Sequence, residues 1–131
     1  MTQRLALVTL IVRNYDEAIA FYTQVLGFHL ESDLDMGGGK RWVVVVPPGP
    51  GGGSGLLLAE AKTEEEKAAV GWQGAGRVWL FLYTDDFWRD YPVLQGRGLK
   101  FLETPRSEVY GHVAVFEDLY GNKWDLLEPL G

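Results

Sequence analysis

Residues 18–28 read Ala-Ile-Ala-Phe-Tyr-Thr-Gln-Val-Leu-Gly-Phe, and this stretch decides how the first half of the chain folds. Its apolar side chains recur at the spacing of one helix face, from Asp16 onward to Leu26. Gly27 supplies a stop signal at the C-terminal end, and Asn14 offers an N-cap at the other. The pattern predicts a helix from Asp16 to Leu26.

Strands are predicted on both sides of this helix. Residues 5–12 precede it and are dominated by Leu, Val and Ile, and residues 28–34, 41–46 and 56–61 follow it with strand-like composition. Gly37-Gly38-Gly39 predicts a hairpin turn between two of them. The Gly- and Pro-rich residues 49–55 predict a loop, which is not a phosphate-binding loop because no Lys-Ser/Thr pair and no helix follow it.

The same order of elements returns after a short charged helix and connector at residues 63–76. Residues 77–83 predict a strand, and a helix from residue 87 to about residue 95 follows the cap candidates Asp85 and Asp86. Pro92 shortens or kinks this helix, and glycines close it. Strands are predicted at residues 99–102, 109–116 and 123–127, with a tight turn at residues 118–122.

The two halves are therefore an internal duplication with an offset of about 72 residues, which matches Leu7 to Trp79 and Asn14 to Asp86. The predicted fold is α+β, with two βαβββ modules that form an eight-stranded curved sheet with the helices outside. At 131 residues the chain fits a single domain. We place module one at about residues 1–61, a connector at about 62–75 and module two at about 76–131.

Composition narrows the classes of partner. The formal net charge of −6 repels nucleic acid and favours a cationic ligand. The absence of cysteine excludes disulfides and thiolate metal sites. No apolar run reaches membrane-spanning length, and the N-terminal residues lead straight into a strand pattern rather than a signal peptide. We therefore expect a cytoplasmic protein that binds neither nucleic acid nor membrane.

Two segments resemble one known superfamily. Residues 18–28, ending in Val-Leu-Gly-Phe, resemble its helix-to-strand segment, and residues 116–128, which read Phe-Glu-Asp-Leu-Tyr-Gly-Asn-Lys-Trp-Asp-Leu-Leu-Glu, resemble its closing hairpin. The superfamily is that of the vicinal oxygen chelate proteins, which include glyoxalase I, extradiol dioxygenases, methylmalonyl-CoA epimerase, fosfomycin-resistance enzymes and bleomycin-binding proteins. The resemblance covers nearly the whole chain and implies a fold more securely than an activity.

The resemblance implies a metal site on the first and last strands of each half, with His, Gln or Glu as ligands. Those positions fall on Leu7 and Trp79 in the first strands, and on Leu57 and Asp125 in the last strands. Only Asp125 offers a ligand atom that a divalent cation accepts. Another alignment would substitute Val78 for Trp79, and a register slip would bring in Glu60. We expect no metal and no other cofactor.

The aromatic residues suggest a ligand site instead. Trp79, Phe81 and Tyr83 share one strand face, which the resemblance turns toward the inside of a cup, while Val78, Leu80 and Leu82 occupy the opposite face. The alternative is that these rings simply pack in the core. The predicted ligand-binding residues are Trp79, Phe81, Tyr83, Asp125, Trp42 and His112.

Other polar residues have less specific interpretations. His112 could transfer protons, but the sequence favours a structural or surface role for it. Asp125 could act as a base or bind a cation if buried, and a solvated or Arg-paired carboxylate is the equal alternative. Arg41 and Arg77 are possible anion anchors or plain strand-end charges, and His29 reads as surface.

The sequence thus favours a metal-independent protein that binds a small molecule, aromatic or cationic, in an aromatic-lined cup. Resemblance to the bleomycin-binding members supports this hypothesis and also implies a homodimer. The alternative hypothesis is a lyase, isomerase or dioxygenase. One version of this enzyme would use a metal held by atypical ligands such as Glu60, His112 and Asp125. The other version would need no metal and would use Asp125 or His112 as a base.

Overall fold

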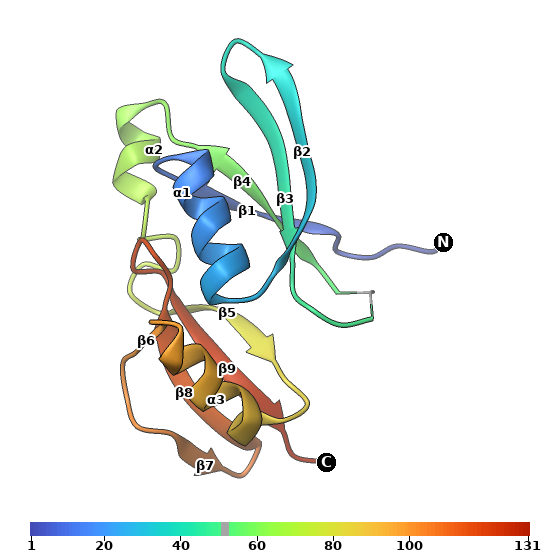
Figure 1. Cartoon of the computed structure of the whole chain (residues 1–131), viewed down its shortest axis with the longest axis vertical. Helices are drawn as coiled ribbons and strands as arrows, with labels where there is room; N and C mark the ends of the chain where they lie inside the picture. The colour runs from blue at the N-terminus through green and yellow to red at the C-terminus, as the bar shows by residue number, and fades with distance from the viewer. Residues whose placement is uncertain (51–52) are drawn as a thin grey trace. The chain divides into compact units, whose positions relative to one another are not determined.

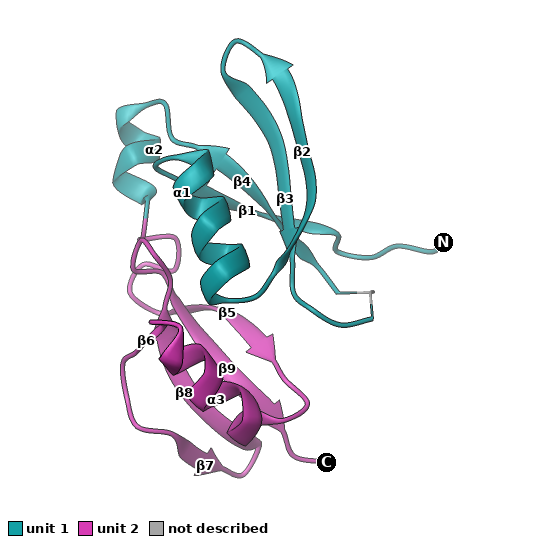
Figure 2. Cartoon of the chain, viewed as in Figure 1, with its two compact units in different colours: residues 1–70 teal, residues 71–131 magenta. Residues whose placement is uncertain are grey.

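The computed structural model describes residues 1–50 and 53–131. Residues 51 and 52, which belong to the predicted loop at 49–55, lie outside the described residues. The chain divides into two compact units, Met1–Val70 and Gly71–Gly131 (Figure 2). Because this boundary falls within the predicted connector, each unit contains one of the two predicted modules, and we call them module one and module two.

Module one has a four-stranded sheet in the order β1-β4-β3-β2 (Figure 1). The strands β1 and β4 are parallel, and the other neighbours are antiparallel. Its elements are β1 (Leu7–Val12), α1 (Tyr15–Ala20), the π-helix η1 (Phe21–Val25), β2 (His29–Gly37), β3 (Lys40–Val46), β4 (Gly55–Glu60) and α2 (Glu64–Ala69).

Module two repeats this arrangement with a sheet in the order β5-β9-β8-β6, to which β7 adds by pairing with β8 (Figure 1). Here β5 and β9 are the parallel pair. Its elements are β5 (Val78–Tyr83), α3 (Phe87–Gly96), β6 (Lys100–Phe101), β7 (Arg106–Glu108), β8 (Gly111–Glu117) and β9 (Lys123–Pro129).

The α+β class, the curved sheets and the repeated order of elements are confirmed. One detail differs, because the described strands number nine and form a four-stranded and a five-stranded sheet, rather than eight strands in one sheet. The extra strand is β7, a charged segment without the apolar alternation that identifies strands. No helix in the described part of the chain is long and apolar enough to cross a membrane.

The predicted first helix changes its winding partway along. It is α-helical over Tyr15–Ala20 and continues as η1, in which the Leu26 N–H donates to the Phe21 carbonyl. Gly27 then turns the chain at φ +76°, a conformation that favours glycine, and Phe28 N–H bonds back to the Tyr22 carbonyl. The predicted end of the first helix at Gly27 is therefore confirmed.

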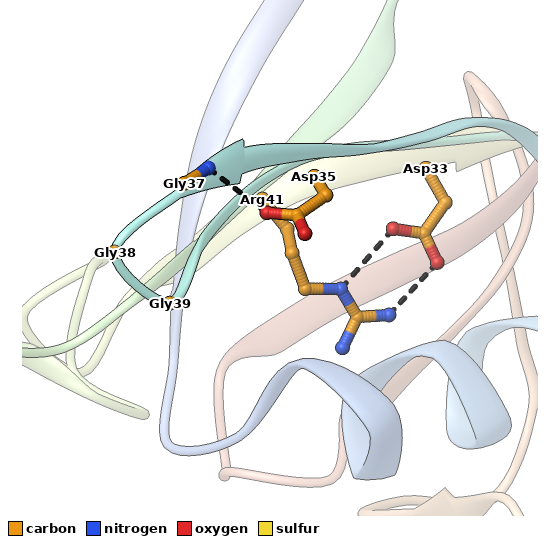
Figure 3. Close-up of a pocket in the computed structure, with 6 residues that line it drawn as sticks. All are labelled: Asp33, Asp35, Gly37, Gly38, Gly39 and Arg41. Atoms are coloured by element: carbon orange, nitrogen blue, oxygen red, sulfur yellow. Dashed lines mark hydrogen bonds and ion pairs between the residues drawn. The ribbon is translucent and has the colours of Figure 1, made fainter.

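The face of module one that carries α1 contains the core. Leu10, Leu58 and Val43 are partners across β1, β4 and β3, and all are buried. Farther along β3, Arg41 binds Asp33 of β2 through two hydrogen bonds of 2.8 and 3.1 Å (Figure 3) and Asp16 of α1 through one of 2.9 Å. These contacts fix the hairpin of β2 and β3 to the helix.

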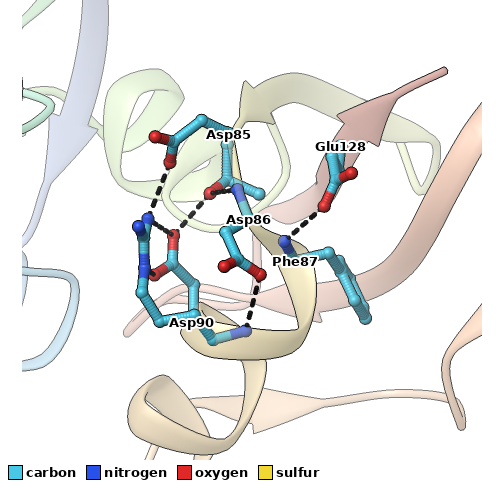
Figure 4. A network of polar contacts seen from close by, with 7 residues as sticks. Asp85, Asp86, Phe87, Asp90 and Glu128 are labelled. Carbon is cyan, nitrogen blue, oxygen red and sulfur yellow. Dashed lines mark hydrogen bonds and ion pairs between the residues drawn. The ribbon is translucent and has the colours of Figure 1, made fainter. Parts of the chain in front are cut away.

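A glutamate from the last strand of each module holds the start of that module's helix. The Tyr15 N–H donates to Glu60 at 3.1 Å in module one, and the Phe87 N–H donates to Glu128 at 2.7 Å in module two (Figure 4). The side chains of the N-caps Asn14 and Asp86 accept from the N–H groups three residues after them, those of Glu17 and Arg89. Side chains thus satisfy two of the four N–H groups that a helix start leaves without partners.

The closing hairpin of module two is organised by two buried polar residues. Asp118 accepts hydrogen bonds from the backbone N–H groups of Tyr120 and Asn122, which shapes the turn between β8 and β9. Asn122 in turn accepts from the Gln73 N–H at 3.1 Å. This segment, one of the two that carry the family resemblance, therefore ties the start of module two to its last strand.

Replacing Glu128 tests the link between α3 and β9. We expect Glu128→Ala to lower the free energy of unfolding by about 1–3 kcal/mol, because the buried Phe87 loses the acceptor of its N–H. Urea denaturation measures this change. Glu65→Ala on the exposed face of α2 is the control and should change stability by less than about 0.5 kcal/mol. Equal losses in the two variants would contradict a specific role for Glu128.

Candidate functional site

The candidate site lies on the sheet face of module two that is turned away from α3. The other face carries α3, because Tyr91 of the helix lies 4.5 Å, between ring centroids, from Phe101, which is the partner of Phe116 in β8. Phe116 also stacks on Trp124 of β9. Since side chains alternate along a strand, their neighbours Val115 and Asp125 belong to the opposite face, which we call the distal face.

Register brings the distal residues together. Phe81 of β5, Asp125 of β9 and Val115 of β8 are partners in one row across the sheet. Tyr83 lies two residues along β5 from Phe81 and therefore on the same face. Three of the six predicted ligand-binding residues, Phe81, Tyr83 and Asp125, thus share one face.

The two aromatic side chains are unusually exposed. Phe81 is 59% exposed and Tyr83 is 66% exposed, although both occupy a strand whose other side chains are half-buried. A phenyl ring on a strand is usually covered by the fold. Rings left open in this way can stack on a planar molecule, which contributes about 0.5–2 kcal/mol per well-placed contact.

Asp125 has the opposite surroundings. It is only 6% exposed, and its Oδ1 atom accepts no hydrogen bond within the described residues. Burial raises the pKa of Asp125, the charge of Arg106 lowers it, and the charge of Glu103 raises it further, with a net rise. A buried carboxylate oxygen without a donor destabilises a fold, which makes Asp125, beside the exposed ring of Phe81, a candidate for a ligand-binding position.

A charged cluster adjoins Asp125. The Arg106 guanidinium donates to both carboxylate oxygens of Glu103 at 3.1 Å, to Glu108 at 2.9 Å and to the Tyr110 hydroxyl at 3.3 Å. Glu103 also accepts from the Val115 N–H at 2.9 Å. Sequence reasoning missed this cluster, because Glu103 and Arg106 lie in a short irregular segment whose only signal is charge.

Trp79 and Trp42 have different settings. A register shift between Val78 and Leu80 interrupts β5 at Trp79, and its ring meets that of Trp124 edge-on, with centroids 6.2 Å apart. Trp79 is half-buried and packs on this core residue. Trp42 belongs to module one, where it is 39% exposed and pairs with Leu34 of β2.

His112 lies on the other face of the module two sheet. Its ring is 5.8 Å from that of Trp88 and 6.4 Å from that of Phe87, both on α3, and its Nδ1 is 2.9 Å from the Ser107 Oγ. The sheet therefore separates His112 from Asp125, and the two side chains do not converge. Arg77 and His29 are exposed.

The donor set does not fit a divalent metal. Leu57 and Asp125 occupy corresponding positions, each three residues before the glutamate that holds its module's helix. Of Leu7, Trp79, Leu57 and Asp125, only Asp125 has an oxygen ligand, whereas a catalytic metal typically has about three protein ligands. Within residues 1–50 and 53–131, no group of three or more His, Asp or Glu side chains could hold a metal ion.

A separate open pocket lies on the hairpin of module one. Asp33, Asp35, Arg41 and the glycines 37–39 line it (Figure 3). Arg41 is already paired with Asp33 and Asp16, and its guanidinium lies over the Tyr15 ring at 5.1 Å from the centroid. These contacts raise the pKa of Arg41 and leave it a structural cation rather than an anion anchor.

Comparison with known proteins covers almost the whole chain. A family model, the Glyoxalase/Bleomycin resistance protein/Dioxygenase superfamily, matches residues 4–126. An uncharacterized protein of Shewanella frigidimarina is 54% identical over 129 residues, which are 98% of this chain and 95% of that protein. The crystal structure of UcmS2 matches with a TM-score of 0.83 at 28% identity, over 98% of this chain and 99% of that one. TnmS3, an antibiotic binding protein from Streptomyces sp. CB03234, matches with a TM-score of 0.79 at 29% identity, over 98% of each chain.

Removing the charge of Asp125 should stabilise the protein. Folding raises the pKa of Asp125, so the folded state holds the Asp125 proton more tightly than the unfolded state does. The protonated carboxyl therefore favours the folded state at low pH, and this contribution to stability is lost as the pH rises through the raised pKa. We expect Asp125→Asn to raise the free energy of unfolding near neutral pH by about 0.5–2 kcal/mol, the range of single stabilising substitutions. Urea denaturation measures this change. The gain should shrink as pH falls toward about 4, the ordinary carboxyl pKa.

Glu117→Gln is the matched control for this experiment. It removes one negative charge from the neighbouring strand β8, where Glu117 pairs with Lys100 at 3.0 Å. It should not stabilise the protein at any pH. Equal stability of Asp125→Asn and the unsubstituted protein across the pH range would show that burial of the Asp125 charge costs nothing.

Proposed function

Because the chain belongs to the glyoxalase/bleomycin resistance/dioxygenase superfamily, we propose that it binds a small planar organic molecule on the distal face of module two, without a metal ion. The observation that carries this proposal is the buried Asp125, whose Oδ1 has no donor in the described chain, beside the exposed ring of Phe81. The protein would sequester the molecule rather than transform it.

The side chains of the site support a planar ligand. Phe81 and Tyr83 present two rings on one strand, and Asp125 supplies a polar group beside them in register with Phe81. A few placed polar groups within an apolar lining are typical of small-molecule sites. Such a site gives affinity through ring contacts and orientation through the carboxylate.

The comparisons support binding of a small molecule. TnmS3 is described as an antibiotic binding protein, and it matches this chain over nearly its whole length. The superfamily also includes enzymes, so membership alone does not decide between binding and catalysis. The residues favour binding, because His112, the other candidate for proton transfer in the sequence, lies across the sheet from Asp125.

A metal-dependent lyase, isomerase or dioxygenase is disfavoured by the same residues. Its atypical ligand set would need Glu60, His112 and Asp125. Glu60 instead accepts the Tyr15 N–H, and His112 and Asp125 lie on opposite faces of one sheet. We therefore propose that no metal takes part.

We further propose that the protein is a homodimer. Leu34 and Met36, each 57% exposed, alternate with aspartates along β2, and Leu34 pairs with the exposed Trp42 of β3. Exposed apolar side chains gathered on one hairpin are typical of surfaces that bind another protein. A second copy of the chain would cover them.

Binding of planar probes tests the proposed function. We expect naphthylmethylamine and aminoacridine to bind, measured by calorimetry, and Phe81→Ala to weaken both about 3- to 10-fold through loss of one ring contact. Trp88→Ala removes an equally exposed ring from α3 and should leave affinity unchanged. Binding should persist in EDTA and gain nothing from nickel, manganese, zinc or ferrous iron. Absence of probe binding, or binding that needs a metal, would refute the proposal.

Sedimentation equilibrium tests the homodimer. The unsubstituted protein should sediment as a dimer, and Trp42→Glu should shift it toward monomer because a charge would be buried at the interface. Val93→Glu places the same charge at an exposed apolar position of α3 and should leave the dimer intact. A monomer at every concentration of the unsubstituted protein would contradict the proposal.

A further inference from the structure

The charges around Asp125 define what kind of polar group a ligand can present there. Glu103 faces it from the segment between β6 and β7, and Arg106 faces it from β7. Its partners in the sheet, Phe81 on β5 and Val115 on β8, carry no charge. With Glu108, which Arg106 also binds, the cluster contains three carboxylates and one guanidinium.

Arg106 is already paired with two carboxylates of this chain. Its Nε donates to Glu103, and its Nη1 donates to both Glu108 and the Tyr110 hydroxyl. These partners raise the pKa of Arg106 and neutralise its charge locally. A carboxylate, sulfonate or phosphate of a ligand would meet the excess of negative charge that three carboxylates and one guanidinium leave at this place.

Asp125, by contrast, requires a donor. Its Oδ1 is buried and accepts no hydrogen bond within the described chain, and such an atom loses the hydration that it would have in water. A cationic donor on a ligand compensates more of this lost hydration than a neutral donor does, because charge-assisted hydrogen bonds are about twice as strong as neutral ones. The formal net charge of −6 also attracts a cation from solution.

We propose that Asp125 pairs with a protonated amine of the planar ligand while the ligand's ring stacks on Phe81, and that the site discriminates against an anionic group at this position. This inference rests on the proposed function and names the chemical class of its ligand. Asp125 favours a ligand with a positively charged group, and the rings of Phe81 and Tyr83 stack on the ligand's planar ring.

Three probes that share one ring system test the selection. They are naphthylmethylamine, which is cationic, naphthalenemethanol, which is neutral, and naphthalenesulfonate, which is anionic. We expect the amine to bind about tenfold or more tightly than the alcohol, equivalent to the strength of one charge-assisted pair, and the sulfonate to bind weakest. In Asp125→Asn, the preference for the amine over the alcohol should disappear.

Two controls separate charge selection from other effects. Glu117→Gln removes the same charge from the protein and should keep the preference for the amine, which excludes a general effect of net charge. Lowering the pH toward the pKa of Asp125 should weaken binding of the amine more than that of the alcohol, because a protonated Asp125 no longer attracts a cation.

The failures of the two proposals are distinguishable. If none of the probes binds, the proposed function is wrong. If they bind through Phe81 but the alcohol or sulfonate equals the amine, the binding site stands and selection by Asp125 is wrong. Tight binding of the sulfonate that Arg106→Met abolishes would identify Arg106 as an anion anchor and overturn the inference.

Discussion

The hydrogen bond between a helix start and a glutamate of the last strand is the constraint on which both modules depend. In each module the chain passes from the first strand into a helix, and the last strand runs parallel to that first strand beside it. The carboxylate of Glu60 or Glu128 then reaches the first N–H group of the helix. Because a one-residue slip would turn every side chain of the last strand to the other face, this contact also fixes which residues face the helix.

That fixed register places Leu57 and Asp125 at the same position of the two modules, on the face away from the helix. The two modules therefore present equivalent surfaces that differ in chemistry. Module one presents Leu57 beside Thr9, whereas module two presents Asp125 beside Phe81. Only the second combination joins a carboxylate to an open aromatic ring, so the proposed ligand site belongs to one module of a scaffold that both modules share.

The sequence predicts most of this scaffold and only part of the site. Helical spacing, N-caps and glycine stops are local signals, and they located α1 and α3 together with the caps Asn14 and Asp86. The facing of Phe81 and Tyr83 followed from strand alternation. The position of Trp79 against Trp124 did not, because a register shift arises from pairing with β9 and leaves no local pattern. Glu103 and Arg106 were missed for a similar reason, since only the folded chain brings this irregular segment beside Asp125.

The charge of Asp125 lowers the stability of the fold, and the position of the residue limits this cost. A buried charge without a partner is normally lost from a core, because an apolar residue at the same place is more stable. Module one has the apolar Leu57 at the equivalent position. Module two keeps the charge at the edge of its core, where Arg106 offsets part of the cost but is itself held by Glu103 and Glu108. The offset is therefore incomplete, and in the proposed complex a cationic ligand would supply the hydrogen-bond donor that Oδ1 lacks in the described chain.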